Sequence, residues 1–169
     1  YDIQAGSYIK KAQANPSYES ERGQAFANVL NQLGDFNSIL ESGIGEGTSH
    51  ASIAPLLQNK NYKLLGFDIS YSRIKYARQF LRDNDTIMPY ELFLGDYLHC
   101  PLSDDSVEIV YTVHALEPSG GMEENILSEL YRVAGKYLVL FEPSYELGSN
   151  AARNYISKHG YVKNLYQTA

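Results

Sequence analysis

A segment with glycine at alternate positions, residues 38–50 (SILESGIGEGTSH), constrains the fold of this chain more than any other feature. An apolar run ends there at Glu41, three glycines follow, and a Thr48-Ser49 pair is suited to begin a helix. Glycine readily adopts positive φ angles and lets a ligand approach the backbone closely. The start of a helix offers unpaired N–H groups and a positive dipole end to an anionic group. The segment therefore predicts a strand, a tight turn and a helix that together bind a nucleotide-like cofactor.

A second apolar run, residues 62–70, contains an acid near its end, Asp68, which stands 21 residues after Gly47. An acid at the tip of the second strand of a nucleotide-binding βαβ unit usually accepts hydrogen bonds from ribose hydroxyls. The alternative is that Asp68 caps a helix, since a helical pattern begins at Ser70 and Tyr71. We favour ribose binding because the whole unit fits the nucleotide-binding pattern.

The spacing of the glycines separates two classes of cofactor. The dinucleotide fingerprint, Gly-x-Gly-x-x-Gly, places its third glycine where Thr48 stands, whereas this chain has Gly-x-Gly-x-Gly with Glu41 two residues before it. That arrangement resembles motif I of the class I S-adenosylmethionine-dependent methyltransferases, of the small-molecule, methyltransferase-11-like type. Residues 95–118 (GDYLHCPLSDDSVEIVYTVHALEP) resemble the third and fourth motifs of the family, and residues 130–144 resemble its fifth strand and the preceding helix. The resemblance covers roughly two thirds of the chain, residues 36–144.

This resemblance and the alternation of strands with helices predict an α/β fold, a Rossmann-like and mostly parallel sheet with helices on both faces. A helix that begins near Ser49 should kink or stop early, because Pro55 lies too deep in it for a first-turn proline. We expect strands near residues 38–41, 63–68, 90–94, 107–113 and 137–141, and further helices near residues 18–33, 71–82, 121–134 and 150–159.

The chain is expected to form one S-adenosylmethionine-binding methyltransferase domain over residues 1–169. Residues 1–34 would form an N-terminal lid and helix, residues 35–144 the cofactor-binding core, and residues 145–169 a C-terminal helical remnant. Members of the family usually add an antiparallel hairpin beside the fifth strand. Because too few residues follow Ser144 for a helix and a hairpin, we expect that the C-terminal hairpin is missing and that the chain is part of a longer protein.

Composition and charge disfavour several other functions. A net charge of −6 argues against a surface that follows nucleic-acid phosphates, so no nucleic-acid partner is expected. No apolar stretch approaches the ~20 residues that span a bilayer, so no membrane partner is expected either. A single cysteine, Cys100, and the lack of Cys/His spacing typical of zinc sites predict no metal and a reducing, cytoplasmic location. The oligomeric state stays open.

The resemblance also assigns a set of residues to the cofactor site. Asp96, after the third expected strand, stands where the acid that contacts the adenine amino group is found in the family. Small-molecule members often fold an N-terminal tyrosine over the cofactor, which Tyr1 and Tyr8 resemble; a frayed terminus is an equal alternative. The complete expected set of cofactor-binding residues is Tyr8, Glu41, Gly43, Ile44, Gly45, Gly47, Asp68, Ile69, Gly95, Asp96, Tyr97, Val113 and His114.

His114, directly after the fourth expected strand, is the candidate catalytic base. Ligands of open parallel sheets bind at the carboxyl ends of the strands, and histidine can accept a proton from a hydroxyl near neutral pH. The alternatives are that His114 only caps the strand or contacts the cofactor through its backbone. Glu117 would orient His114, act as the base, or be a solvated loop acid, which we favour, and His50 is expected to be a surface or packing residue. A base is not obligatory, because positioning contributes about 7–11 kcal/mol and a general base about 3–5 kcal/mol.

Three functions compete on this evidence. The first is methyl transfer from S-adenosylmethionine to a small molecule or saccharide, at oxygen because residues 112–118 lack the Asn-Pro-Pro-Tyr type motif of many amino-group methylators. The second is a nicotinamide-dependent Rossmann reductase, which the glycine spacing disfavours. The third is a non-catalytic, methyltransferase-like module that binds the cofactor without transferring a methyl group.

Overall fold

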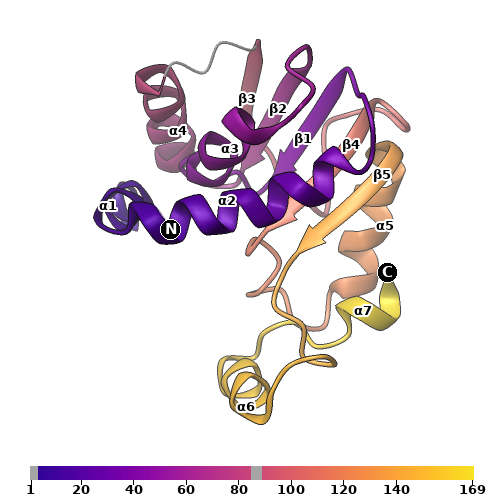
Figure 1. Cartoon of the computed structure of the whole chain (residues 1–169). Coiled ribbons are helices and arrows are strands. Elements are labelled where there is room, and N and C mark those ends of the chain that lie inside the picture. Colours follow the sequence, from indigo (N-terminus) through magenta and orange to yellow (C-terminus); the bar gives the residue numbers. More distant parts are fainter. Residues whose placement is uncertain (1–3, 85–88) are drawn as a thin grey trace.

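Five parallel strands form the central sheet of the computed structural model, which describes residues 4–84 and 89–169 (Figure 1). Neighbouring strands are paired in the order β3-β2-β1-β4-β5, and every pair is parallel. Their bounds are β1 (Ser38–Ser42), β2 (Lys63–Asp68), β3 (Tyr90–Leu94), β4 (Val107–Val113) and β5 (Ala134–Phe141).

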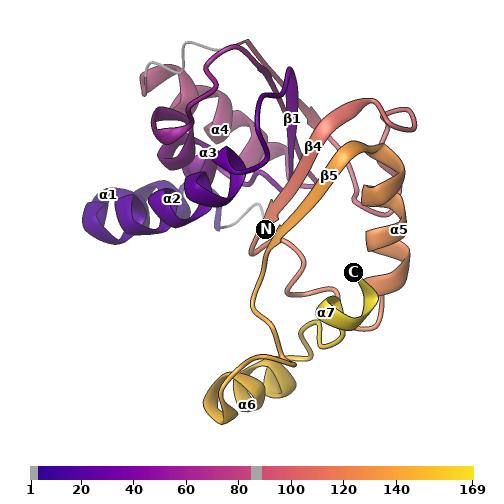
Figure 2. The same ribbon diagram turned by 45° about the vertical axis from the view of Figure 1, so that its right-hand side comes forward.

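Helices cover both faces of the sheet, as expected from the alternation of strands and helices (Figure 2). One face carries α2 (Pro16–Asn31), α3 (Thr48–Ile53) and α4 (Tyr71–Asp83), and the opposite face carries α5 (Glu123–Val133) with α7 (Leu165–Thr168). The helices on each face pack against the sheet and bury a separate apolar core. This is why the inner strands are apolar along most of their length rather than alternating, since both of their faces are buried. Buried residues of the two cores include Leu30, Ile39, Ile53, Leu64 and Leu81 on the first face, and Leu40, Val110, Ile126 and Leu130 on the second.

The order of the strands fixes where a ligand can bind. β1 lies at the centre, with β2 and β3 on one side and β4 and β5 on the other. At such a switch point the connections leave in opposite directions, so a crevice opens beyond the carboxyl ends of the strands. Glu41 in β1, Asp68 at the end of β2 and Val113 at the end of β4 are therefore brought to one edge of the sheet.

The expected bounds hold for the first four strands, and the early stop at Pro55 is confirmed. α3 ends at Ile53, and Pro55 lies in a short 3-10 helix, η2 (Ala54–Leu56). The expected bounds of the next helix and strand were wrong: β5 begins at Ala134 rather than at residue 137, directly after α5. The N–H of Asp105 donates to the carbonyl of Arg132, and Val107 pairs with Ala134. These two contacts with the start of β4 turn the chain from helix to strand without a loop.

The segment after β5 forms α6 (Asn150–His159), which lies below the sheet in Figure 1, and then returns to α5. The N–H of Val162 donates to the carbonyl of Glu117, and that of Lys163 donates to a carboxylate oxygen of Glu123. Residues 142–169 contain no hairpin, and β5 is an edge strand of the sheet in the described ranges. None of the helices in those ranges is long and apolar enough to cross a bilayer.

We expect Gly43→Ala to destabilise the protein more than Gly34→Ala. Both glycines have left-handed φ angles, +73° and +81°, so each alanine carries a backbone cost of about 1–2 kcal/mol. A Cβ on Gly43 would lie 2.5 Å from the Cβ of Ala115, whereas nothing lies within 4 Å of a Cβ on Gly34. The clash should add about 1–3 kcal/mol. Thermal unfolding of the two variants measures the difference, and equal losses of stability would contradict the close approach of the turn to Ala115.

Candidate functional site

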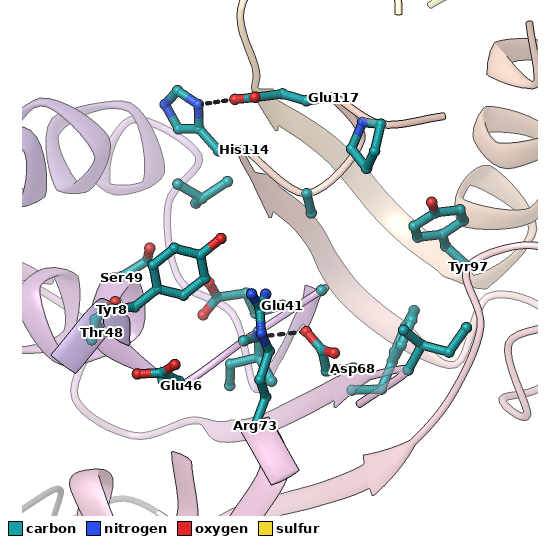
Figure 3. A pocket seen from close by; sticks show the side chains of 18 of the residues that line it. Tyr8, Glu41, Glu46, Thr48, Ser49, Asp68, Arg73, Tyr97, His114 and Glu117 are labelled. Carbon is teal, nitrogen blue, oxygen red and sulfur yellow. Dashed lines mark hydrogen bonds and ion pairs between the residues drawn. The ribbon is translucent and has the colours of Figure 1, made fainter. Parts of the chain in front are cut away.

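A cavity of about 810 Å³ lies at the carboxyl ends of the inner strands (Figure 3). Its volume is within the usual range of small-molecule sites, about 300–1,000 Å³. Every residue of the expected cofactor set lines this cavity except Gly47. The residues come from five places in the chain, which the fold gathers at one edge of the sheet: α1 (Ser7–Ala14), the glycine turn, and the ends of β2, β3 and β4.

Gly47 has a different place from the one expected. It is the N-cap residue of α3, with φ of +77°, and a Cβ there would lie 3.2 Å from Leu81 and 3.5 Å from Ala77 of α4. Its lack of a side chain therefore serves the packing of α3 against α4. Thr48 and Ser49, in the first turn of α3, line the cavity next to it.

Two hydrogen bonds hold the glycine turn against the end of β2. The N–H of Ile44 donates to the carbonyl of Phe67 at 2.9 Å, and the N–H of Gly45 donates to Oδ2 of Asp68 at 3.0 Å. Gly43 and Gly45 have φ angles of +73° and +57°, which only glycine adopts at little cost. The backbone of the turn is thus presented to the cavity in a fixed position.

Asp68 is not the N-cap of the following helix, which was the alternative to ribose binding, but it contacts the residue that is. Its Oδ1 accepts the N–H of Ser70 at 2.8 Å, and Ser70 is the N-cap of α4, accepting the N–H of Arg73. A carboxylate has about four acceptor positions, so two backbone donors leave capacity for the hydroxyls of a ligand. Asp68 is only 7% exposed and lines the cavity.

Glu41 is a deeply buried acid in the cavity wall. It is 1% exposed, and its Oε2 accepts the hydroxyl proton of Tyr111 at 2.7 Å. Burial raises the pKa of Glu41 to about 8, although the bond from Tyr111 and the charge of Arg22 act in the opposite direction, and the charge of Asp68 raises it further. The side chain therefore carries a proton over much of the neutral range in the absence of a cationic ligand.

The N-terminal segment forms a helix over the cavity, and we call this helix, α1, the lid. Both carboxylate oxygens of Glu46 accept backbone N–H groups at its start, from Gly6 at 2.8 Å and from Ile9 at 2.9 Å. Tyr8 projects from the lid into the cavity, with the guanidinium of Arg73 4.5 Å from the centre of its ring. Residues 7–14 are thus helical rather than frayed, whereas Tyr1 lies outside the described residues.

Sequence patterns did not predict a role in the cavity for Glu46 or Arg73, which both line it. An acid between Gly45 and Gly47 is typical of a solvated turn. The residues whose N–H groups it accepts, Gly6 and Ile9, lie about 40 positions earlier in the chain. The only local signal was an acid with a glycine on each side, Gly45 and Gly47.

His114 lies at the rim of the cavity, just after β4, with a left-handed φ of +50° that is uncommon outside glycine. Its Nδ1 hydrogen-bonds to Oε1 of Glu117 (Figure 3), so Glu117 is not merely a solvated loop acid. This bond raises the pKa of His114, against the opposing effect of burial. Glu142 accepts the N–H of Ala115 at 2.9 Å, and burial raises its pKa to about 7. The loop after β4 is thus held in place by two acids.

The end of β3 closes the opposite wall. Asp96 accepts the N–H of Leu98 at 2.9 Å, and the Tyr97 hydroxyl is hydrogen-bonded to Ser119. Gly95 packs closely on the ring of Phe67, since a Cβ added to Gly95 would lie 3.1 Å from that ring. The expected residues of the third motif therefore face the cavity from the side of the sheet opposite the histidine.

Fold and cavity together define a Rossmann-like, nucleotide-cofactor-binding α/β domain. Residues 39–136 match the family model described as "Methyltransferase domain". The chain belongs to this family, and its cofactor class is S-adenosylmethionine. The nicotinamide-dependent alternative is thereby set aside.

Comparison with individual proteins agrees with this assignment. The chain is 27% identical over 128 residues to carboxy-S-adenosyl-L-methionine synthase of Shewanella sediminis (strain HAW-EB3), covering 69% of this chain and 52% of that protein. It thus spans about half the length of the curated relative it matches. A structure of a putative methyltransferase from Bacillus halodurans C-125 superposes with a TM-score of 0.63 at 26% identity, over 80% of this chain and 58% of that one. The methyltransferase in a complex with the Haloferax volcanii Trm112 activator shares the fold, with a TM-score of 0.68 at 18% identity, over 96% and 69% of the two chains.

We expect Glu41→Gln to stabilise the protein in the absence of ligand, increasingly as pH rises. The pKa of Glu41 is about 8 in the fold against 4.5 for an unperturbed glutamate. Between these values the folded state binds a proton that the unfolded state lacks, so the wild type loses stability as pH increases. Glutamine keeps an acceptor for Tyr111 and does not ionise. The free energy of unfolding of the variant should exceed that of the wild type by on the order of a few kcal/mol near pH 8.

Thermal unfolding at a series of pH values from 5 to 8 measures this difference. Glu21→Gln, on an exposed position of α2, is the control for loss of one negative charge. A gap between Glu41→Gln and wild type that stays constant with pH would show that the buried carboxyl is ionised throughout.

Proposed function

We propose that this chain transfers a methyl group from S-adenosylmethionine to a hydroxyl oxygen of a small molecule or saccharide. The observation that carries the proposal is that the glycine turn, Asp68 and the His114–Glu117 pair face one cavity. A cytoplasmic location is part of the same proposal, supported by a single, buried cysteine, Cys100.

The residues present fit the cofactor on their own chemistry. The bare backbone of Gly45, where an added Cβ would meet only the ring of Tyr8, leaves room for an adenosyl group beside the turn. Asp68 has acceptor capacity for ribose hydroxyls, and Asp96 faces the cavity where the adenine amino group would be bound. The buried acid Glu41 offers a negative charge to a cationic part of the ligand. When bound, S-adenosylmethionine supplies an activated methyl group, and the protein supplies positioning, exclusion of water and control of a proton.

The position of the lid supports the exclusion of water from the cavity. Tyr8 lies over the glycine turn, with ring carbons 3.8 and 3.9 Å from an added Cβ on Gly45, and Arg73 packs on the same ring. Lys11, Asn15 and Arg22 continue the cavity wall along α1 and α2. A reaction centre under this layer is shielded from water. The same contacts hold the two reactants in one orientation.

The residues at the rim of the cavity support oxygen as the atom that accepts the methyl group. An unactivated hydroxyl loses its proton as it attacks, so a base within hydrogen-bond reach accelerates the step by roughly 10²–10⁴-fold. His114 is partly exposed at the rim, and its Nδ1 contact with Glu117 leaves Nε2 as the atom that accepts the proton. Glu117 then stabilises the imidazolium that forms.

Asp68→Ala tests the cofactor part of the proposal. Hydrogen bonds to charged groups contribute about 1.5–3 kcal/mol each, so we expect at least about tenfold weaker binding of S-adenosylmethionine by calorimetry. Asp68→Asn keeps one acceptor oxygen and should lose less. Thermal unfolding accompanies both, because Asp68 also holds Gly45 and Ser70. Unchanged affinity in a folded Asp68→Ala protein would refute ribose binding at this position, and wild-type protein that binds NADH instead would refute the cofactor.

The catalytic part is tested by the pH dependence of turnover. His114 acts as a base only when neutral, and Glu117 raises its pKa above 6.5, so turnover should increase with pH through that raised pKa. Glu117→Gln should move this acidic limb to lower pH. His114→Ala should lower turnover by roughly 10²-fold or more with cofactor affinity unchanged.

Turnover is measured as transfer of labelled methyl from S-adenosylmethionine to a panel of hydroxyl compounds and saccharides, with the corresponding amines as controls. Transfer to the amines alone would contradict the oxygen acceptor. Binding of the cofactor without transfer to any compound would favour a non-catalytic module. An acidic limb that stays in place in Glu117→Gln would exclude His114 as the titrating base.

A further inference from the structure

A chain of four buried side chains leads from the cavity wall into the core under α2 and α3. Oε2 of Glu41 lies 2.7 Å from the Tyr111 hydroxyl, which lies 2.8 Å from Nδ1 of His50. Nε2 of His50 lies 3.3 Å from the hydroxyl of Tyr62. All four residues are at most 3% exposed, and the proposed function uses only Glu41.

All three hydrogen bonds of this chain can form with either of two arrangements of the hydrogens. The arrangements differ in whether Oε2 of Glu41 carries a proton. When Oε2 is bare, Tyr111 donates to it, the Tyr111 oxygen accepts from Nδ1–H of His50, and Nε2 accepts from Tyr62. When Oε2 is protonated, Glu41 donates to Tyr111, Tyr111 donates to Nδ1, and Nε2–H donates to Tyr62. His50 is neutral in both, in agreement with burial lowering its pKa to about 3.

We propose that Tyr111, His50 and Tyr62 are positioning residues that pass a proton away from Glu41 when a cationic group of the cofactor enters the cavity. This inference rests on the proposed function, because S-adenosylmethionine carries two such groups, the sulfonium and the ammonium. A nearby cation favours the carboxylate form of Glu41. Burial without a cation favours the acid form.

The proton balance of the step is complete. The proton on Oε2 of Glu41 moves to the Tyr111 oxygen, the former Tyr111 proton moves to Nδ1 of His50, and the Nε2 proton moves to Tyr62. The former hydroxyl proton of Tyr62 is the one released to solvent, because Tyr62 is the last member of the chain and, at 3%, the most exposed of the four. One proton is released per cofactor bound, Glu41 becomes a carboxylate, and the other three residues remain neutral.

The groups around Glu41 place this change near neutral pH. Burial is the largest influence on its pKa and raises it to about 8. Arg22 on α2 and the hydrogen bond from Tyr111 on β4 act against that rise, and Asp68 on β2 adds to it. Glu46 and Arg73 line the same cavity from the glycine turn and α4.

Calorimetry in buffers of different ionisation enthalpy counts the protons released on binding. At pH 7 we expect about one proton released per S-adenosylmethionine, falling towards zero at about pH 9, where Glu41 is already ionised. S-adenosylhomocysteine has the ammonium but no sulfonium. Release with both ligands assigns the effect to the ammonium, and release with S-adenosylmethionine alone assigns it to the sulfonium.

Tyr62→Phe separates a proton chain from a structural role. Tyr62 does not line the cavity. Its loss leaves Nε2–H without an acceptor in the protonated arrangement and bare Nε2 without a donor in the other, and an orphaned buried N–H is the more costly of the two. Glu41 should therefore ionise more easily without ligand, and proton release at pH 7 should decrease. Tyr90→Phe is the matched control, because its hydroxyl contacts the carbonyl of Arg78, outside the chain. Glu41→Gln should abolish the release.

The ring proton of His50 gives an independent readout in the wild-type protein. In ¹⁵N-histidine-labelled protein, a protonated ring nitrogen and a bare one resonate in separate ranges, and His50→Asn assigns the signal among four histidines. We expect the proton on Nε2 without ligand and on Nδ1 with S-adenosylmethionine. Should Tyr62→Phe fail to fold, this measurement decides alone.

The outcomes separate the two proposals. Failure of S-adenosylmethionine to bind overturns the proposed function. Binding with an unchanged His50 tautomer, or with equal proton release in Tyr62→Phe and Tyr90→Phe, overturns the hydrogen-bond chain and leaves the proposed function standing.

Discussion

The hydrogen bond from the N–H of Gly45 to the carboxylate of Asp68 is the interaction on which the site depends. It joins the turn after β1 to the end of β2, so two segments that are separate in sequence become one wall of the cavity. Asp68 also supports the start of α4, because its Oδ1 accepts the N–H of the N-cap residue, Ser70. Because one carboxylate fixes a turn, a strand end and a helix start, the geometry of the site follows from the packing of the sheet and does not depend on a flexible loop.

Buried acids are the second organising feature. Glu41, Glu46 and Asp68 are all at most 7% exposed and line one cavity. Burying ionised groups is costly unless they are paired or hydrogen-bonded, and each acid here has a different compensation. Asp68 and Glu46 accept backbone N–H groups, whereas Glu41 has a hydroxyl donor and a raised pKa. The same wall thereby contains two acids held by backbone N–H groups and one whose charge, in our proposal, responds to a ligand.

Local patterns were sufficient to predict the sheet and the glycine turn. The first four strands, the early end of α3 at Pro55 and the helix at residues 150–159 depend on periodicity, proline and glycine, which act within a few residues. The start of β5 at Ala134 was missed because its pairing with Val107 decides it, and no local signal marks that contact. For the same reason the lid contacts of Glu46 and the partners of His50 were not predicted. They join residues 12 to 61 positions apart, and their chemistry exists only after the layers have packed.

The capping of α1 by Glu46 has a consequence for how the N-terminus behaves. The acid stands between two glycines of the turn after β1, and its hydrogen bonds to the lid in the described ranges are with the backbone amides of Gly6 and Ile9. Every residue except proline has a backbone N–H, so most substitutions along the lid leave both hydrogen bonds in place, whereas Gly6 has a φ of +91° that favours glycine. Lid residues that line the cavity, such as Tyr8 and Lys11, can therefore be replaced without loss of the contacts that hold the helix to the glycine turn.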